Sequence, residues 1–266
     1  MKDKIVLEVK DLAISFQQYT HLWQQRIVQP IKSLNIDIRA GEVHGIIGAS
    51  GSGKSLLAHA ILGILPANSH CGGSIFYKGE LLTAERKSAL RGQTIAFVPQ
   101  SVNYLDPLMK VGQQISLGLD GKKKEKEASL LRTYSLQVED GDKYPYQLSG
   151  GMLRRVLFAT SVKEGIELII ADEPTPGIHQ AALNAILKQL RSFADQGAAV
   201  IMITHDISSA LTIGDRVTVM KDGSTIETAP VKAFTGRGHD LKDSYTRKLW
   251  LCLPENDFIN YREALT

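Results

Sequence analysis

The stretch GASGSGKS, Gly48 to Ser55, follows the short apolar run VHGIIG and precedes the helical pattern LLAHAILGIL. Glycines in such a turn let successive backbone N–H groups point at a phosphate, and the helix that begins at Lys54 adds the positive end of its dipole. The lysine supplies a cation for the β- and γ-phosphates, and the Ser55 hydroxyl supplies a ligand for Mg²⁺. This spacing, between a strand and a helix, predicts a phosphate-binding loop for a nucleoside triphosphate.

Length and composition limit the class of protein. The chain has 266 residues, of which 43% are hydrophobic and 22% charged, which predicts one large globular domain or a domain with a subdomain. The opening MKDKIVLEVK is unlike a signal peptide, and no run approaches the ~18 apolar residues of a membrane span, so we expect a cytoplasmic protein. Two cysteines, Cys71 and Cys252, are too few for a disulfide scaffold or a four-thiolate metal site. The net charge of +3 indicates ordinary solubility.

Four short apolar runs predict parallel strands that are buried on both faces of a sheet. They are VHGIIG (43–48), TIAFVPQ (94–100), ELIIADE (167–173) and AAVIMITHD (198–206). In an open α/β sheet, ligands bind outside the carboxyl ends of the strands. We therefore expect the residues that end these runs to form one nucleotide site.

The third run ends on two adjacent carboxylates, Asp172 and Glu173, and buried carboxylates require a cation. The predicted cation is Mg²⁺ carrying the nucleotide. Because neighbouring residues on a strand point to opposite sides, the two acids can have separate roles. We expect Asp172 to hold the Mg²⁺ shell and Glu173 to act as the general base for the attacking water. At the other ends, we expect Gln100 to meet the metal and the water, and His205 to donate to the leaving γ-phosphate.

An insertion from Ser101 to about Arg154 separates the second and third of these runs. It ends in YQLSGGMLRRVLFATSV, where Ser149 is a natural helix N-cap and Gly150 and Gly151 leave bare N–H groups at the start of a helix. These groups form a second anion site. One chain does not obviously need two phosphate cradles, but two chains that face head to tail do.

Together these motifs resemble those of the ATP-binding cassette (ABC) transporter ATPases, over nearly the whole chain. GASGSGKS is similar to Walker A, LIIADE to Walker B and LSGGM (148–152) to the signature motif, while Gln100 and His205 match the Q-loop glutamine and the switch histidine. The resemblance implies an α/β fold of the P-loop NTPase (RecA-like) type, with a mostly parallel sheet core, an N-terminal antiparallel β subdomain and an inserted α-helical subdomain. It also implies a dimer that clamps each ATP between Walker A of one subunit and the signature of the other.

The resemblance also implies a division of the chain and a set of ligand-binding residues. The catalytic core comprises 1–100 and 155–230, the helical subdomain 101–154 and a C-terminal extension 231–266. The residues implied to bind ATP or Mg²⁺ are Gly48, Ser50, Gly51, Ser52, Gly53, Lys54, Ser55, Leu56, Ser149, Gly150 and Gly151, with Ser55, Gln100 and Asp172 on the metal. Phe16 matches the aromatic residue that stacks on adenine, with Tyr19 as a rival and ordinary sheet packing as the alternative.

Several phrases resemble the ATPases of peptide importers and of nickel or metal-chelate importers: LDPLMKVGQQI (105–115), GILP (63–66), SGGML (149–153) and SYTRKLWLCLP (244–254). In those importers two different ATPases usually pair beneath two permeases, and an external solute-binding protein acts with the permeases. The resemblance thus implies a peripheral subunit at the cytoplasmic face of the membrane, and we expect the segment 100–114 to contact the permease. The chain lacks the C-terminal cysteine cluster of longer oligopeptide members, which favours the nickel branch.

The chain departs from the family pattern after Walker B. Family members commonly read EPTTALD where this chain reads EPTPGIH (173–179). His179, largely neutral at pH 7, thus replaces an aspartate that helps couple the two ATP sites. The exchange is compatible with asymmetry in a heterodimer and with drift at a tolerant position. An alternative function is therefore a regulatory or degenerate nucleotide clamp with little turnover, although the chain's own Walker residues are intact.

Two further functions are disfavoured. GKKKEKEASLL (121–131) has mixed charges and no interleaved aromatics, so it predicts a solvated helix rather than a nucleic-acid site. ABC ATPases of translation or DNA maintenance usually carry a second cassette or a long coiled coil, for which 266 residues leave no room.

Overall fold

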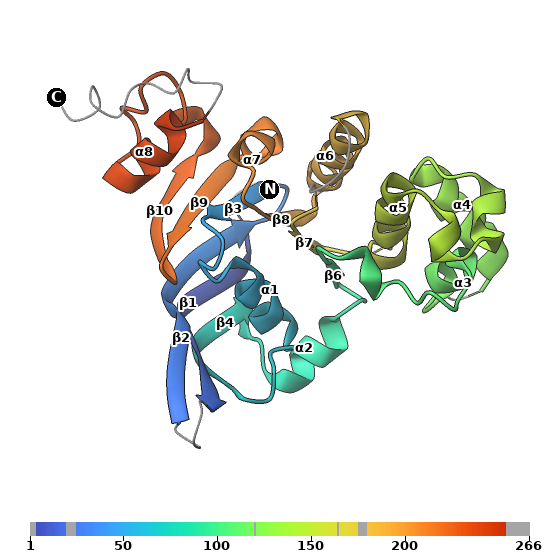
Figure 1. Ribbon diagram of the computed structural model, residues 1–266, viewed down its shortest axis with the longest axis horizontal. Helices are drawn as coiled ribbons and strands as arrows, with labels where there is room; N and C mark the ends of the chain where they lie inside the picture. Colours follow the sequence, from blue (N-terminus) through green and yellow to red (C-terminus); the bar gives the residue numbers. More distant parts are fainter. Residues whose placement is uncertain (1–3, 20–24, 120, 164, 175–179, 254–266) are drawn as a thin grey trace.

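The computed structural model describes residues 4–19, 25–119, 121–163, 165–174 and 180–253, and within these ranges the strands form one ten-stranded sheet (Figure 1). Its order is β5-β4-β1-β2-β10-β9-β3-β8-β7-β6. The strands are β1 (Ile5–Tyr19), β2 (Gln25–Arg39), β3 (Val43–Gly48), β4 (Ser69–Tyr77), β5 (Glu80–Leu81), β6 (Ile95–Val98), β7 (Leu168–Asp172), β8 (Ala199–Thr204), β9 (Arg216–Lys221) and β10 (Ser224–Pro230).

The helices lie between and around these strands. The α-helices are α1 (Lys54–Leu62), α2 (Ala84–Leu90), α3 (Val111–Ser116), α4 (Lys123–Thr133), α5 (Gly150–Ser161), α6 (Gln180–Asp195), α7 (Ile207–Ile213) and α8 (Ser244–Leu251). Short 3-10 turns occur at η2 (Val102–Tyr104), η3 (Val138–Asp142), η4 (Pro145–Gln147) and η5 (Val231–Ala233). None of the helices in the described ranges is both long enough and apolar enough to cross a membrane.

Parallel pairing holds the central strands together, and antiparallel pairing holds the N-terminal ones. The strands β6, β7, β8, β3 and β9 are parallel neighbours, whereas β1 pairs antiparallel with both β2 and β4. All four predicted apolar runs are strands of the parallel part, and every residue of β3, β7 and β8 is buried. The expected fold class, a mostly parallel core with an antiparallel β subdomain and a helical insertion, is confirmed.

Two hydrophobic clusters cover opposite faces of the parallel strands. Leu168 and Ile170 of β7 join the cluster that contains α1, whereas Ile169 and Ala171 join the cluster that contains α5 and α6. This alternation follows from the two-residue period of a strand. Asp172 has the parity of Leu168 and Ile170, so its side chain belongs to the face covered by α1, the helix that follows the phosphate-binding loop.

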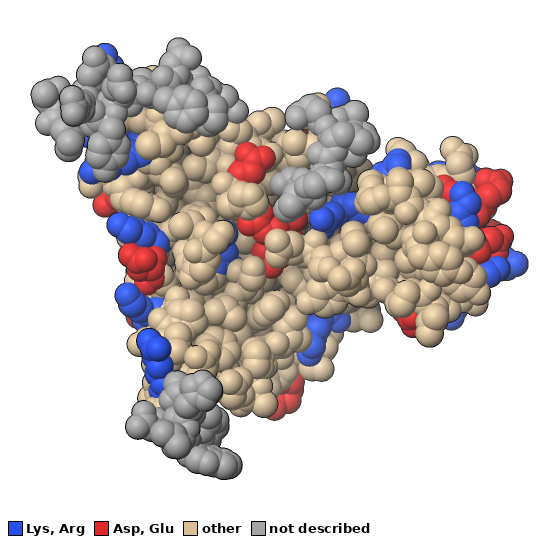
Figure 2. Space-filling model, viewed as in Figure 1, with Lys and Arg blue, Asp and Glu red and all other residues tan. Residues whose placement is uncertain are grey.

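The helical subdomain is set to one side of the sheet and contains α3, α4 and the start of α5 (Figure 1). Figure 2 shows both signs of charge interspersed over its outer end, and residues 121–126 are exposed, as the mixed-charge pattern predicts. α5 crosses the predicted subdomain boundary at residue 154 and packs against the core strand β6. One helix therefore belongs to both parts of the molecule.

The C-terminal part of the described chain packs on β10 through α8. The ring of Trp250 meets the ring of Phe234 edge to face, with centroids 6.0 Å apart, and its Nε1 donates to the carbonyl oxygen of Gly236 at 3.0 Å. Leu241 is fully buried in the same cluster, which includes residues of β9 and of α7. The segment 231–253 is thus an integral layer of the fold.

Few backbone pairs connect the antiparallel part of the sheet to the rest of the sheet. β10 pairs with β2 through a single backbone position, Ser224 opposite Ser33. Nearby, Arg216 of β9 donates two hydrogen bonds to the carboxylate of Asp37 on β2, from Nη1 to Oδ2 at 2.8 Å and from Nη2 to Oδ1 at 2.9 Å. Hydrogen bonds and charge from Arg216, helped by Arg39, hold the pKa of Asp37 at about 2 against the opposing effect of burial. The fork therefore stabilises a joint that has few backbone bonds.

We predict that Asp37→Asn lowers the free energy of unfolding by about 1 kcal/mol at pH 7, a value reduced for solvent screening because Asp37 is partly exposed. Since folding lowers the pKa of Asp37, its contribution is complete above pH about 5 and is lost as the pH falls toward 2. Urea denaturation of both proteins across this range measures the difference.

The matched control is Asp142→Asn, because the side chain of Asp142 is 87% exposed in its ion pair with Lys110. It should change stability by less than about 0.5 kcal/mol. A difference between wild type and Asp37→Asn that stays constant down to pH 2 would contradict the assigned ion pair.

Candidate functional site

The loop between β3 and α1 has a backbone that requires glycine. Gly51 and Gly53 have φ angles of +82° and +97°, a region that side chains with a Cβ rarely adopt. A Cβ at Gly53 would also lie 2.7 Å from Cγ1 of Ile31. Ser52, whose N–H donates to the carbonyl oxygen of Ala49 at 3.1 Å, is buried, whereas Ser50 and Gly51 are exposed. The predicted phosphate-binding loop is thus a tight turn directly before a helix.

Lys54 lies buried beneath this turn. Its Nζ donates to the carbonyl oxygens of Gly48 at 2.8 Å and of Ala49 at 3.1 Å. Burial lowers the pKa of the ammonium group, while the charges of Glu173 and Asp172 act in the opposite direction. The loop lysine and the two strand-end acids are therefore close enough to interact electrostatically.

Asp172 ends β7 and is buried, with 4% of its surface exposed. Burial raises the pKa of its carboxyl, and a hydrogen bond with the Ser55 side chain opposes this rise. Within the described ranges, Oδ1 of Asp172 and Oγ of Ser52 are buried without a hydrogen-bond partner. Unpartnered buried polar atoms are rare, and a ligand at this edge of the sheet would satisfy these two, although Oγ1 of Thr246 on α8 is also buried without a partner.

Glu173 follows in a left-handed backbone conformation, with a φ angle of +45°. Such a conformation is strained for a residue with a side chain and persists only where the surroundings hold it. Here its N–H donates to the carbonyl oxygen of Ile203 at 2.8 Å. The N–H of His205 donates to Oε1 at 3.1 Å, and Nδ1 of His205 lies 2.8 Å from Oε2. Sequence patterns gave no signal for this strained turn or for the histidine–carboxylate contact.

Gln100 lies two residues beyond the end of β6, and β6 pairs with β7 so that Val98 is opposite Ala171. This register brings Gln100 to the same edge of the sheet as Asp172. Gln100 is exposed, and its carbonyl oxygen accepts a hydrogen bond from Nη1 of Arg154 on α5. No sequence pattern indicated a contact for Arg154, because a cation inside a helical pattern is ordinarily a surface residue.

The signature residues lie at the start of α5, in the helical subdomain. Ser149 caps the helix, and its Oγ accepts from the N–H of Met152 at 3.4 Å. Ser149 and Gly150 are exposed, and a Cβ added at Gly150 or Gly151 would meet no atom within 4 Å. The helix start is therefore open to solvent, and a ligand can approach the bare N–H groups.

The remaining predicted residues have less distinctive surroundings. Leu56 is half-buried on α1, and Phe16 is half-buried on β1, opposite Val28 of β2 and Ser69 of β4. Phe16 packs against the cluster that contains α1, so the adenine role stays a prediction. The side chain of Tyr19 and all of His179 lie outside the described residues.

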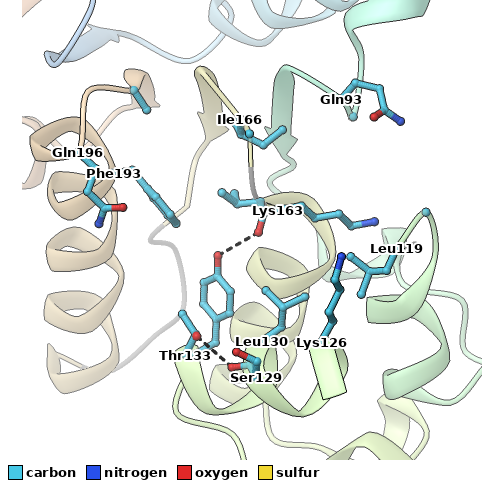
Figure 3. A pocket seen from close by; sticks show the side chains of 16 residues that line it. Gln93, Leu119, Lys126, Ser129, Leu130, Thr133, Lys163, Ile166, Phe193 and Gln196 are labelled. Carbon is cyan, nitrogen blue, oxygen red and sulfur yellow. Dashed lines mark hydrogen bonds between the residues drawn. The ribbon is translucent and has the colours of Figure 1, made fainter. Parts of the chain in front are cut away.

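A cavity of about 630 Å³ lies between the helical subdomain and the core (Figure 3). Lys126 and Lys163 lie on one side of it, and Phe193 and Gln196 on the other. The lining residues that come from the sheet core lie just before strands: Gln93 precedes β6, and Gln196 precedes β8. The cavity is thus at the amino ends of the parallel strands, at the opposite edge from the predicted nucleotide residues.

The fold and the carboxyl edge of the sheet define a nucleoside triphosphatase with a phosphate-binding loop. The profile of the ABC transporter family matches residues 31–176, more than half of the chain. The oligopeptide transport ATP-binding protein OppD of Bacillus subtilis is 34% identical over 94% of this chain and 72% of its own length. OppD of Salmonella typhimurium is 35% identical over 84% of this chain and 69% of its own length. The chain belongs to the ABC transporter family and is an ATPase of that family.

Solved structures agree with this assignment. The dimeric structure of a post-hydrolysis state of the ATP-binding cassette MJ0796, bound to ADP and Pi, superposes with a TM-score of 0.73. It is 25% identical in sequence and covers 85% of this chain and 98% of its own. The expected enzyme class and nucleotide are thereby confirmed.

Proposed function

We propose that this chain is the ATP-hydrolysing subunit of a peptide importer, peripheral to the cytoplasmic face of the membrane. The observation that carries the proposal is the grouping of Lys54, Asp172 and Glu173 at the carboxyl ends of the parallel strands. The relatives that match this chain along most of its length are oligopeptide transport ATP-binding proteins. These relatives favour peptide over the nickel or metal-chelate solutes that the missing cysteine cluster favoured.

Residues on the α1 face of the sheet suit a bound Mg²⁺–ATP. The Asp172 carboxylate and the Ser55 hydroxyl are oxygen ligands of the kind Mg²⁺ takes, and Oδ1 of Asp172 has no other partner within the described ranges. Gln100 reaches the same edge. When bound, Mg²⁺ neutralises charge that develops on the phosphates. Lys54, with the N–H groups of the loop, supplies the fixed positive charge around them.

Glu173 is the proposed general base, and His205 orients it. The backbone N–H and the ring of His205 both contact the Glu173 carboxylate. The left-handed backbone conformation of Glu173 sets the direction in which its side chain leaves the main chain. The side chain of His205 is 60% exposed, so it can also reach a γ-phosphate. A held carboxylate beside an accessible imidazole suits the activation of a water molecule.

A second ATPase subunit supplies the other half of each site. The open helix start at Ser149 offers N–H donors to a nucleotide carried by another molecule, which is the arrangement expected of two chains facing head to tail. With His179 in place of the family aspartate, we propose a heterodimer with unequal sites. A regulatory clamp with little turnover is the competing function.

The permease contacts the segment 100–114 and the neighbouring turn at η4. Leu108 is 86% exposed, Tyr104 67% and Tyr146 72%, and the rings of Tyr144 and Tyr146 stack at 5.6 Å. Exposed large apolar side chains of this kind mark surfaces for protein contact. Leu105, by contrast, is buried in the helical subdomain, so it is unsuitable for such a contact although the sequence places it in the same segment.

We predict that Glu173→Gln retains ATP binding and cuts turnover at least ~10²-fold, because the amide cannot accept the proton of the attacking water. Nucleotide titration and phosphate release measure the two quantities. The control is Glu167→Gln, at the amino end of the same strand, where Oε2 accepts from the Tyr77 hydroxyl at 2.7 Å. Turnover of Glu173→Gln within about threefold of wild type would remove Glu173 as the base.

In the assembled transporter, cysteines introduced at Tyr104 or Leu108 should form crosslinks to the permease, because both side chains are largely exposed on the surface of this subunit. Cysteine at Lys188, exposed on α6, is the control. Mass spectrometry of the crosslinked complex locates the partner residues. Crosslinks obtained from Lys188 alone would mean that the docking face is misplaced.

Stepwise reconstitution in lipid vesicles tests the transport function. The chain alone should hydrolyse ATP poorly, since half of each phosphate cradle is missing, and a second ATPase subunit should raise turnover. Addition of the permeases and the binding protein should make turnover respond to peptide but not to nickel or a nickel chelate.

Each other outcome has a definite meaning. A response to nickel alone would overturn the peptide assignment. Robust cooperative hydrolysis by the isolated chain would indicate a homodimer. If the paired complex turned over only at its partner's Walker site, as tested with Lys54→Ala in this chain, the clamp function would replace the proposed one.

A further inference from the structure

Arg154 connects two predicted site segments that are far apart in the sequence. It lies on α5, five residues after the helix cap Ser149, and its surface is only 7% exposed. Its Nη1 donates to the carbonyl oxygen of Gln100 and lies 3.5 Å from the carbonyl oxygen of Pro99. A single guanidinium thus joins the helix of the signature motif to the segment that leaves β6.

The surroundings of Arg154 are unusual for a buried cation. Within the described ranges no carboxylate acts on its charge, and burial lowers the pKa of its guanidinium. Burying a charge is costly, and an apolar side chain would fill such a space more cheaply. Two backbone carbonyl dipoles compensate the charge. Both contacts are made by one nitrogen, Nη1, of a guanidinium that stays charged, whereas a methionine at this position would offer no donor.

The neighbouring arginine shows that this contact is specific. Arg155 donates to the carbonyl oxygens of Ser135 at 2.7 Å and of Gly151 at 3.3 Å. Both acceptors belong to the helical subdomain, so the hydrogen bonds of Arg155 stay within that subdomain and do not reach the core. Arg154, one residue earlier on the same helix, faces the core instead. The crossing contact therefore depends on one side chain rather than on the general basicity of the helix.

We propose that Arg154 is a positioning residue that makes Gln100 and the signature helix move as one unit. Gln100 serves the nucleotide bound by this chain, and Ser149 serves the nucleotide of the second subunit, so the guanidinium couples the two ATP sites. A displacement of α5 is transmitted to the carbonyl of Gln100 without passing through the longer chain path from 101 to 148. The proposal rests on the role proposed above for Gln100.

The test compares Arg154→Met, Arg154→Lys and Arg191→Met in the paired ATPase complex. Arg154→Met should lower kcat on the order of tenfold, the loss expected for a hydrogen bond from a charged donor, with the KM for ATP unchanged. It should also raise the Mg²⁺ concentration for half-maximal turnover and reduce the Hill coefficient for ATP toward one. Arg154→Lys, which keeps one charged donor, should restore part of each property.

Arg191→Met is the matched structural control. Arg191 also donates to backbone carbonyls, those of Gly41 and Ile213, both at 3.2 Å, but far from Gln100 in the fold. Unlike Arg154, it also pairs with the carboxylates of Asp195 at 2.9 Å and Asp215 at 2.6 Å, so its removal tests the loss of a packed arginine away from the nucleotide edge. It should lower thermal stability and leave kcat, Mg²⁺ dependence and the Hill coefficient of the folded protein unchanged. If Arg154→Met behaved in the same way, Arg154 would be a packing residue and the proposal would be wrong.

Gln100→Ala separates this proposal from the one on which it rests. Unchanged Mg²⁺ dependence in Gln100→Ala would refute the metal role of Gln100 itself. Changed Mg²⁺ dependence in Gln100→Ala, together with wild-type behaviour of Arg154→Lys and Arg154→Met, would refute only the coupling by Arg154. If Arg154→Met failed to fold, full wild-type cooperativity and Mg²⁺ dependence in Arg154→Lys would still contradict the proposal that the guanidinium positions Gln100.

Discussion

Burial of the parallel strands on both faces is the constraint on which the rest of the structure depends. A strand covered on two sides can carry no charge along its length, so polar chemistry is confined to its ends. β7 and β8 follow this rule, and β3 departs from it only at His44, whose buried ring contacts Glu42 and Thr218. The charged side chains Lys54, Asp172 and Glu173 gather where these strands finish. The electrostatic contact between the lysine and the two acids follows from the packing of the sheet.

The parts of this arrangement that the sequence predicts are those set by local physics. Apolar runs predict the buried strands, and Gly51 and Gly53 predict a turn, which has positive φ angles at both residues. A strand–loop–helix order then places Lys54, and the parallel pairing of β6 with β7 places Gln100 near Asp172. Each of these inferences needs only a few neighbouring residues or the general rule for open sheets.

Contacts between distant residues escape such reasoning. Asp37 and Arg216 are 179 positions apart, and no pattern near either one indicates a joint between two parts of a sheet. Arg154 and Gln100 are 54 positions apart, and a cation in a helix is ordinarily solvated. The burial of Leu105 depends on helices that fold around it, so a segment expected to face outward is divided into buried and exposed positions. Tertiary packing, rather than local propensity, decides all three.

The alternation of β7 between its two covered faces also limits what mutation can do to this chain. Insertion or deletion of one residue between 168 and 172 would turn every later side chain to the other face. Asp172 would then face the layer of α5 and α6, and Glu173 would take the place under the loop lysine. Length changes are therefore forbidden in this strand even when hydrophobicity is kept. Exposed turns, such as those at Gly79 and Gly92, where an added Cβ would meet nothing within 4 Å, tolerate changes of chain length better than this strand does.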